Sequence, residues 1–298
     1  MFNRFRFAQA CSGILATPPV KLDRNSNLML FSQLQHKDVL LALLAVKSFV
    51  SRTAVGAIRI LNDGSLTPSD FALLRSHLPG VEFVDLEEVR SAHCPTGGCW
   101  ERLLWIARLT RDHYVIQLDS DTLTLADIPE VRACVDENRS FVIGTWDRQD
   151  FEPMTATVIA AKNRMASQQG EPHVQLLAEA NFDGLDRYHD IRYVRGCAGF
   201  SGFASGSVDR TFIETISQQM GQIIGKAWHR WGSEQVMSNI VVANDPSAMV
   251  LPHPKYCDCT KLKEDIAVFV HFIGACRFTG DAYQRLANQV IGPLRRVS

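Results

Sequence analysis

The sequence has few of the features that would place the protein in a membrane or on nucleic acid. It contains no run of about eighteen apolar residues, so a transmembrane helix is not expected. A formal net charge of −1 gives no electrostatic reason to expect nucleic-acid binding. No internal repeat, low-complexity tract or linker interrupts the chain. With 298 residues it can bury a large core, and a single domain over residues 28–298 is predicted.

Cysteine occurs at eight positions, but without the spacing of a structural site. Six of the cysteines stand apart in the sequence. Cys257 and Cys259, with His253 nearby, form the one close group, and this group lacks the paired spacing of a structural zinc site. Thiols are therefore expected rather than disulfides. Reduced thiols and the lack of a membrane span together favour a cytoplasmic protein.

The two ends of the chain differ from the middle. Residues 1–27 are aromatic and basic, then proline-containing, with no sustained period, and are predicted to be a loose N-terminal extension with order beginning at Leu28. At the other end, Tyr283, Leu286 and Val290 are spaced to pack on the body of the protein. The basic residues of that tail leave a peripheral membrane contact open.

Short apolar runs alternate with helical segments from Leu28 onward. This alternation is typical of an α/β fold in which a mostly parallel sheet is flanked by helices. Residues 150–195 are polar and irregular, and are expected to be a loop-rich insertion over the functional site. Expected strands are 28–34, 57–61, 81–86, 114–121, 141–146 and 266–272, and expected helices are 39–50, 68–78, 100–107, 213–223 and 233–242.

Two carboxylates follow the apolar run of residues 114–118. Asp119 and Asp121 are two residues apart, and side chains so spaced in an extended strand point the same way. Two acids this close repel each other unless a cation or proton lies between them, and a hard divalent ion is the natural partner. In open parallel sheets ligands bind beyond the carboxyl ends of strands, which is where this pair lies.

Asp119-Ser120-Asp121 resembles the Asp-x-Asp motif of GT-A-fold glycosyltransferases, especially retaining family 8 enzymes of the glycogenin and bacterial galactosyltransferase type. The resemblance implies a GT-A (Rossmann-like) fold and metal-dependent sugar transfer from a nucleoside-diphosphate sugar, with a UDP-sugar as the expected donor. Haloacid-dehalogenase phosphatases also carry Asp-x-Asp after an apolar strand. They favour Thr or Val where this chain has Leu123, so that alternative is weaker.

Two further segments resemble the same enzymes in the same order. Trp100-Glu101-Arg102-Leu103 is similar to their aromatic-x-Arg-Leu element, which implies that Arg102 contacts the donor. Arg102 also has no acidic neighbour three or four residues away on its helix, so its charge needs a partner elsewhere. Glu234-Gln235 to Asn239 resembles the Asp-Gln-x-x-x-Asn element near the sugar, with Glu in place of Asp. Gln235 and Glu234 are thus the candidates at the reacting centre.

His271 to Arg277 resembles the closing His-x-x-Gly-x-x-Lys motif of the family, with Arg in place of Lys. This implies that His271 is the third protein ligand of the metal and that Gly274 and Arg277 contact the diphosphate. Oxygen ligands mixed with an imidazole favour Mn²⁺, with Mg²⁺ as the alternative. Arg can replace Lys because it binds phosphate in a bidentate manner.

Other assignments depend on position alone. Gln33 and Asp63 lie at the ends of the first two expected strands, where the base and ribose of the donor would lie, and Ser120 lies within the acidic motif. Ser201-Gly202 is a further candidate near the sugar. The resemblance implies retention of configuration. An inverting enzyme would need a carboxylate base, and Glu234 or Asp147 could serve.

A carbohydrate, a lipid-linked sugar and a protein are all compatible with the sequence as acceptors. A non-catalytic protein that only binds nucleotide sugars is the second candidate function. It predicts donor binding without turnover.

Overall fold

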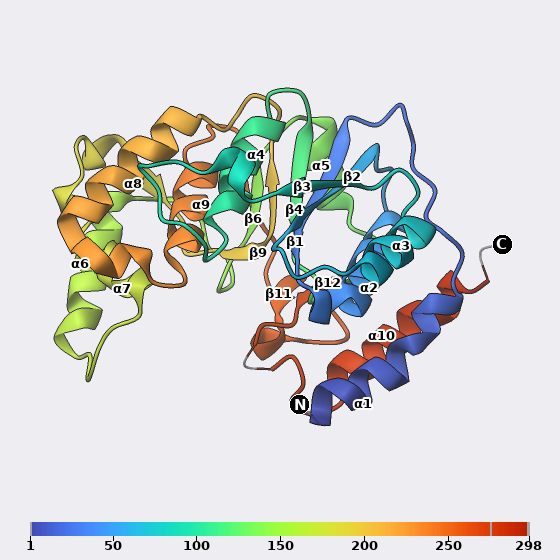
Figure 1. Cartoon of the computed structure of the whole chain (residues 1–298). Coiled ribbons are helices and arrows are strands. Elements are labelled where there is room, and N and C mark those ends of the chain that lie inside the picture. Colours follow the sequence, from blue (N-terminus) through green and yellow to red (C-terminus); the bar gives the residue numbers. More distant parts are fainter. Residues whose placement is uncertain (1, 275, 297–298) are drawn as a thin grey trace.

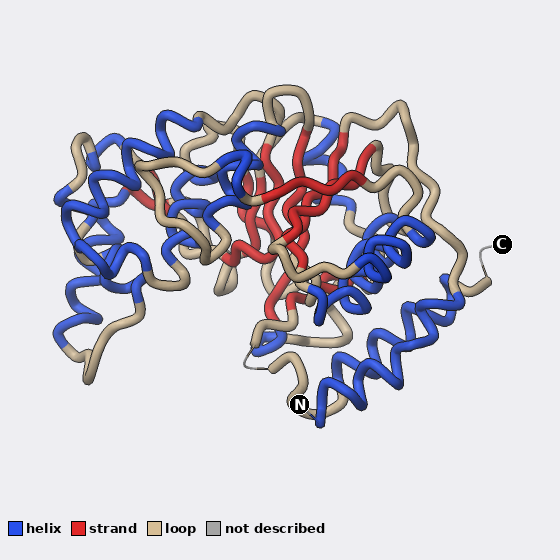
Figure 2. Tube along the Cα trace, in the orientation of Figure 1, coloured by secondary structure: helices blue, strands red, loops and turns tan. Residues whose placement is uncertain are grey.

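A seven-stranded sheet forms the centre of the part of the protein that the computed structural model describes (Figure 1 and Figure 2). Neighbouring strands are parallel except β9, which is antiparallel to both of its neighbours, β4 and β6. The α/β class and the mostly parallel sheet are therefore confirmed. In order across the sheet the strands are β10 (Met249–Leu251), β6 (Phe141–Ile143), β9 (Cys197–Phe203), β4 (Tyr114–Leu118), β1 (Leu28–Leu34), β2 (Ala57–Asn62) and β3 (Glu82–Asp85).

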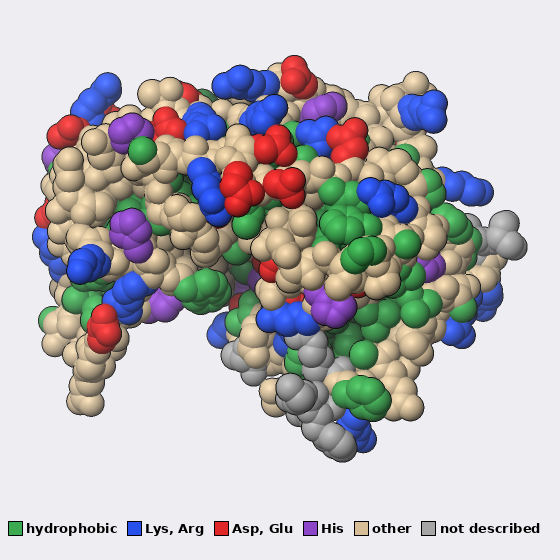
Figure 3. Space-filling model, viewed as in Figure 1, with side chains coloured by type: hydrophobic (Ala, Val, Ile, Leu, Met, Phe, Trp, Pro, Cys, Tyr) green, Lys and Arg blue, Asp and Glu red, His purple; other side chains and the backbone are tan. Residues whose placement is uncertain are grey.

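The description covers residues 2–274 and 276–296. Ala275 of the closing motif and the last two residues of the predicted domain lie outside it. Within these ranges no helix is long and apolar enough to cross a membrane. On the face shown in Figure 3, Lys and Arg side chains are interspersed with Asp and Glu, in agreement with the net charge of −1.

Helices cover both faces of the central sheet. Because successive side chains of a strand point to opposite faces, each strand contributes to two cores. In β1, Leu30 joins the core shared with α2, α5 and α10, while Phe31 joins the core shared with α4, α8 and α9. This double burial explains why the strands are apolar runs rather than alternating patterns. The covering helices are α2 (Val39–Val50), α3 (Pro68–His77), α4 (Trp100–Leu109), α5 (Pro129–Asp136), α8 (Arg210–Ile224), α9 (Ser233–Ala243) and α10 (Ala282–Leu294).

A second, three-stranded sheet adjoins the acidic motif. It has the order β11-β12-β5, and β12 runs antiparallel to β5 with His271 opposite Thr122. This pairing brings His271, the last residue of β12, next to the acidic motif, because Thr122 directly follows Asp121. The expected strand 266–272 is thus shorter than predicted. The bounds are β5 (Thr122–Thr124), β11 (Tyr256–Asp258) and β12 (Phe269–His271).

Two regions are more regular than the sequence indicates. Residues 150–195, expected to be mostly loop, contain α6 (Met154–Ala166), α7 (Val174–Glu179) and a two-stranded ribbon of β7 (Glu152–Pro153) and β8 (Arg192–Tyr193). These helices lie at the left of Figure 1 beside α8. The buried positions of α6 are Met154, Thr157, Val158 and Ala161, which do recur at helical spacing, so the sequence carried a period here that was overlooked.

The other region is the N-terminus, where α1 (Phe2–Cys11) packs beside α10 (Figure 1). The ring of Phe7 lies 4.4 Å from that of Tyr283 and 5.5 Å from that of Phe278, measured between centroids. Tyr283 and Leu286 of α10 are buried, as the sequence predicts. Order therefore begins before Leu28, because α1 is stabilised by contacts with residues more than 270 positions later in the chain.

Cys259 and Cys276 form a disulfide with a Cα–Cα distance of 6.1 Å. This corrects the expectation that the cysteines are all thiols. The bond joins the segment after β11 to the turn after β12, which carries Gly274 and Arg277. No spacing motif in the sequence indicated the pair. The cytoplasmic location depended partly on free thiols and stays a prediction.

Candidate functional site

The two acids of the Asp-x-Asp motif lie in the short connection between β4 and β5. β4 ends at Leu118, so the pair follows the strand rather than forming part of it. The Asp119 N–H donates to the carbonyl oxygen of Gly199 in β9 at 2.9 Å, and the Thr122 hydroxyl donates to the Asp119 carbonyl oxygen at 2.8 Å. These bonds fix the connection from both sides.

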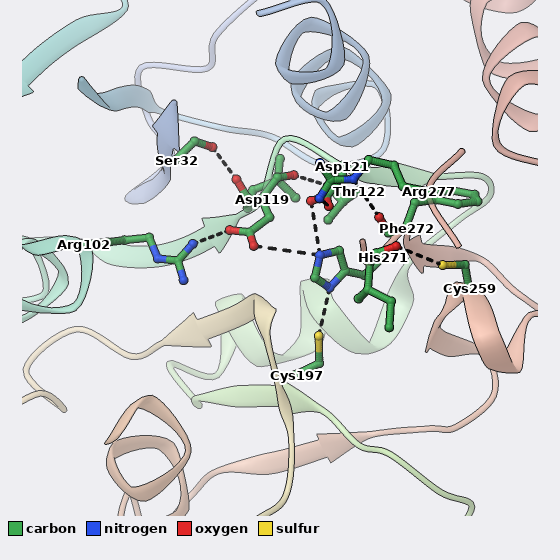
Figure 4. A network of polar contacts seen from close by, with 12 residues as sticks. Ser32, Arg102, Asp119, Asp121, Thr122, Cys197, Cys259, His271, Phe272 and Arg277 are labelled. Atoms are coloured by element: carbon green, nitrogen blue, oxygen red, sulfur yellow. Dashed lines mark hydrogen bonds and ion pairs between the residues drawn. The ribbon is translucent and has the colours of Figure 1, made fainter. Parts of the chain in front are cut away.

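His271 completes a group of three possible metal ligands at this connection. Its Nε2 lies 3.2 Å from Oδ1 of Asp121 and 3.9 Å from Oδ2 of Asp119, and one ligand atom from each of the three residues lies within 4.8 Å of the others. Figure 4 shows the imidazole between the acidic pair and Cys197. The fold thus brings together the three residues that the sequence predicts as metal ligands, although Asp121 and His271 are 150 positions apart.

The residues of this group fit a divalent cation. Two carboxylates and one imidazole form a mixed oxygen and nitrogen set that suits Mn²⁺ and also accepts Mg²⁺. Burial raises the pKa of Asp119. Burial would also raise the pKa of Asp121, but His271 and Arg277 beside it outweigh this and lower that pKa below its usual value. An ionised carboxylate is the form that a metal requires.

Arg102 is buried between two acids. It pairs with Asp119, and its Nη2 lies 3.2 Å from Oε2 of Glu234 in the first turn of α9. Arg102 and Glu234 are both at least nine-tenths buried. The sequence indicated that Arg102 needs an acidic partner from outside its own helix. It has two, Asp119 of the predicted metal group and Glu234 of the predicted reacting centre.

Glu234 is expected to make folding stability depend on pH. Burial raises its pKa from the ordinary 4.5 to about 7. Between these values the folded protein holds a proton that the unfolded chain has released, so stability falls as pH rises, by about 1.4 kcal/mol per unit. The Glu234→Gln variant lacks this dependence. Urea unfolding should show its stability rising relative to the wild type by up to about 3 kcal/mol from pH 4.5 to pH 7. A constant difference would contradict the buried carboxyl.

Arg277 follows β12 and turns back over the acidic pair. Its Nε donates to the Phe272 carbonyl oxygen at 3.1 Å, and its guanidinium pairs with Asp121 (Figure 4). The backbone N–H of Arg277 donates to the carbonyl oxygen of Ile273 at 2.9 Å, and the neighbouring Cys276 is in the disulfide. A tight, cross-linked turn therefore places this cation at the site.

A cavity of about 300 Å³ opens over these groups. Asp63 is not among the described residues that line it, and its Oδ1 accepts instead from the N–H and hydroxyl of Ser65 at 2.9 and 2.6 Å. Ser201, also outside the lining, pairs with Gln117 inside the sheet. The residues predicted from the sequence that do line the cavity are Gln33, Arg102, Asp119, Ser120, Asp121, Glu234, Gln235, His271, Gly274 and Arg277.

The sequence did not single out Cys197 or Trp231, which also line the cavity. The side chain of Trp231 is exposed, with 75% of its surface accessible. Gly199 of β9 also lines the cavity, and it lies against His271. Ser233, the first residue of α9, accepts a hydrogen bond from the Trp100 indole at 2.9 Å and does not cap its own helix.

No protein-family profile and no curated protein matches this sequence. Solved structures do match. An active-site mutant of the galactosyltransferase LgtC has a TM-score of 0.50 at 12% identity, over 88% of this chain and 94% of that chain. The chain has the GT-A fold.

Two further glycosyltransferase structures resemble this GT-A chain more distantly. Mouse xyloside xylosyltransferase 1 matches with a TM-score of 0.47 and 14% identity, over 84% of this chain and 97% of that chain. Core-mannan synthase A from Aspergillus fumigatus, in its Mn/GDP form, gives 0.44 and 10%, over 79% and 75%. The fold predicted from the Asp-x-Asp resemblance is confirmed by the LgtC match.

Proposed function

We propose that this GT-A chain is a metal-dependent glycosyltransferase that moves a sugar from a nucleoside-diphosphate sugar to an acceptor. One observation carries the proposal: candidate ligand atoms of Asp119, Asp121 and His271 lie within 4.8 Å of one another in the lining of a cavity that two arginines also line. A carboxylate and imidazole set beside fixed positive charge suits a divalent ion and a diphosphate together. A UDP-sugar is the expected donor, and a carbohydrate, lipid-linked sugar or protein the acceptor.

Asp119, Asp121 and His271 would hold Mn²⁺ or Mg²⁺ in this reaction. The bound ion supplies positive charge that stabilises the departing diphosphate. Arg277, which now pairs with Asp121, lies where it can exchange that carboxylate for a phosphate oxygen. Gly274 lines the cavity in the same turn, and an added Cβ there would meet no neighbouring atom within 4 Å.

The reacting end of the sugar would lie beside the first turn of α9. Gln235 and Glu234 line the cavity there, and Arg102 holds Glu234 through their ion pair. Retention of configuration is the expected outcome, with Gln235 near the reacting carbon. Asp147, the alternative base, lies outside the cavity lining and is exposed beside Arg148. NMR of the first-formed product distinguishes retention from inversion.

The direct test is a panel of nucleotide sugars incubated with the purified protein and Mn²⁺. Release of the nucleoside diphosphate from one donor, lost on chelation and restored by added Mn²⁺, is expected. Donor binding in calorimetry without turnover on any acceptor would instead support a non-catalytic sugar-nucleotide-binding protein. Release of phosphate from simple phosphomonoesters would support the phosphatase alternative.

Replacement of Arg277 by alanine should weaken donor use. Loss of a charge-assisted contact to phosphate costs about 1.5–3 kcal/mol, which corresponds to a donor KM raised roughly 10- to 150-fold. The matched control is Arg285→Ala. Arg285 follows Arg277 by two helical turns' length in the sequence, forms an exposed ion pair with Glu264 and does not line the cavity. Steady-state kinetics with donor and acceptor varied separately will measure this. An effect confined to the acceptor KM would contradict the assignment.

A further inference from the structure

Strand β9 touches both segments that carry the candidate metal ligands. The carbonyl oxygen of Gly199 accepts from the Asp119 N–H at 2.9 Å. Two residues earlier on the strand, Sγ of Cys197 lies 2.9 Å from Nδ1 of His271 (Figure 4). The residues of β9 therefore connect the acidic turn with the histidine, although the three segments are far apart in the sequence.

Because Gly199 has no side chain, the imidazole of His271 can lie directly against its backbone. A Cβ added to this residue would lie 2.1 Å from Cε1, 2.4 Å from Nδ1 and 2.7 Å from Nε2 of His271. Atoms do not approach this closely, so any side chain at Gly199 would displace the ring. The ring atoms belong to a side chain that is itself nine-tenths buried, so the ring has little room to move away.

We propose that Cys197 and Gly199 are positioning residues for His271. Gly199 admits the ring, and Cys197 holds it with the Nδ1 hydrogen directed at Sγ, so that Nε2 faces Asp121 and Asp119. When a histidine binds a metal through one ring nitrogen, the other ring nitrogen usually donates a hydrogen bond to a neighbouring group. That group fixes the tautomer and the orientation of the ring. Here a thiol has that place, and sulfur is a weak acceptor of hydrogen bonds. The inference rests on the metal role in the proposed function.

The test measures Mn²⁺ binding to the protein without donor, from the electron paramagnetic resonance signal of the free ion. Cys197→Val removes the acceptor at similar volume and should weaken the affinity about 10- to 100-fold. Cys197→Ser restores an acceptor and should bind within a few-fold of the wild type. Gly199→Ala should bind as weakly as the valine variant or more weakly. Cys134→Val is the matched control, because Cys134 is a buried thiol outside the cavity, and its affinity should not change.

Wild-type affinity in the Cys197→Val variant would overturn the proposal, and so would equal losses in the Val and Ser variants. Crystal structures of the metal-free variants provide an independent readout. The His271 ring should keep its place beside Asp121 in the wild type and the Ser variant, and should turn away from it in the Val variant. If the wild type binds no Mn²⁺, the metal role in the proposed function fails. The position of the ring in the metal-free variants then decides the positioning role by itself.

Discussion

Replacement of Asp121 by asparagine is expected to reduce donor turnover by about a thousandfold. Metal ions stabilise developing charge by several kcal/mol, and about 4 kcal/mol corresponds to this factor. Asparagine keeps the size of the side chain but removes the negative charge that a divalent ion requires. Asp121 is also the acid that both His271 and Arg277 contact, so its charge is central to the group.

The control for this variant is Asp127→Asn. Asp127 is exposed, pairs with Arg132 and lies outside the cavity, so turnover should stay close to the wild-type value. Both variants should unfold cooperatively, and Mn²⁺ affinity should fall only for Asp121→Asn. Unchanged turnover in Asp121→Asn would refute the proposed site, whereas lost turnover in the control would point to a general effect of removing an acid.

Replacement of Arg102 by methionine is expected to destabilise the fold by about 3–5 kcal/mol. Breaking a buried ion pair by removing one partner leaves an uncompensated charge, and this costs more than the pair itself contributes. In this chain Glu234 and Asp119 would both lose their cation. A loss of this size is a large fraction of the 5–15 kcal/mol that is typical of a folded domain.

Arg108→Met on the same helix provides the comparison for urea unfolding. Arg108 is half exposed, pairs with Glu88 at 3.7 Å and lies over the ring of Trp105. Exposed contacts of this kind contribute at most about 1 kcal/mol each. Similar losses in the two variants would contradict the buried network around Arg102. The loss in Arg102→Met should grow as pH rises above 7, because Glu234, whose pKa is about 7 in the wild type, ionises there only while Arg102 is beside it.

The parallel part of the sheet and the three candidate metal ligands were accessible from the sequence because their signals are local. The strands β1 and β4 are mostly apolar, since helices cover both faces, and β2 is interrupted by Arg59 alone before its end. Asp119 and Asp121 stand out as acids directly after such a run. His271 was found through the Gly and Arg that follow it, and not through any property of its own strand.

The contacts of β9 were not accessible in this way. Cys197 meets His271 only because β9 inserts antiparallel between β4 and β6, and sheet order depends on interactions distant in sequence. The same applies to α1, which is stabilised by α10. The disulfide of Cys259 was missed because its partner lies across a turn and has no motif spacing. Each of these features depends on tertiary contacts rather than on a local pattern.

The separation of the three candidate ligands also has a consequence in time. Chains grow at about 5–20 residues per second, so the 150 positions between Asp121 and His271 take roughly 8–30 s to synthesise. During this interval the growing chain carries both carboxylates but not the imidazole. An ion that needs all three side chains therefore cannot guide folding during this interval. Capture of an ion by the full proposed set can come only after His271 has been synthesised and β12 has paired with β5.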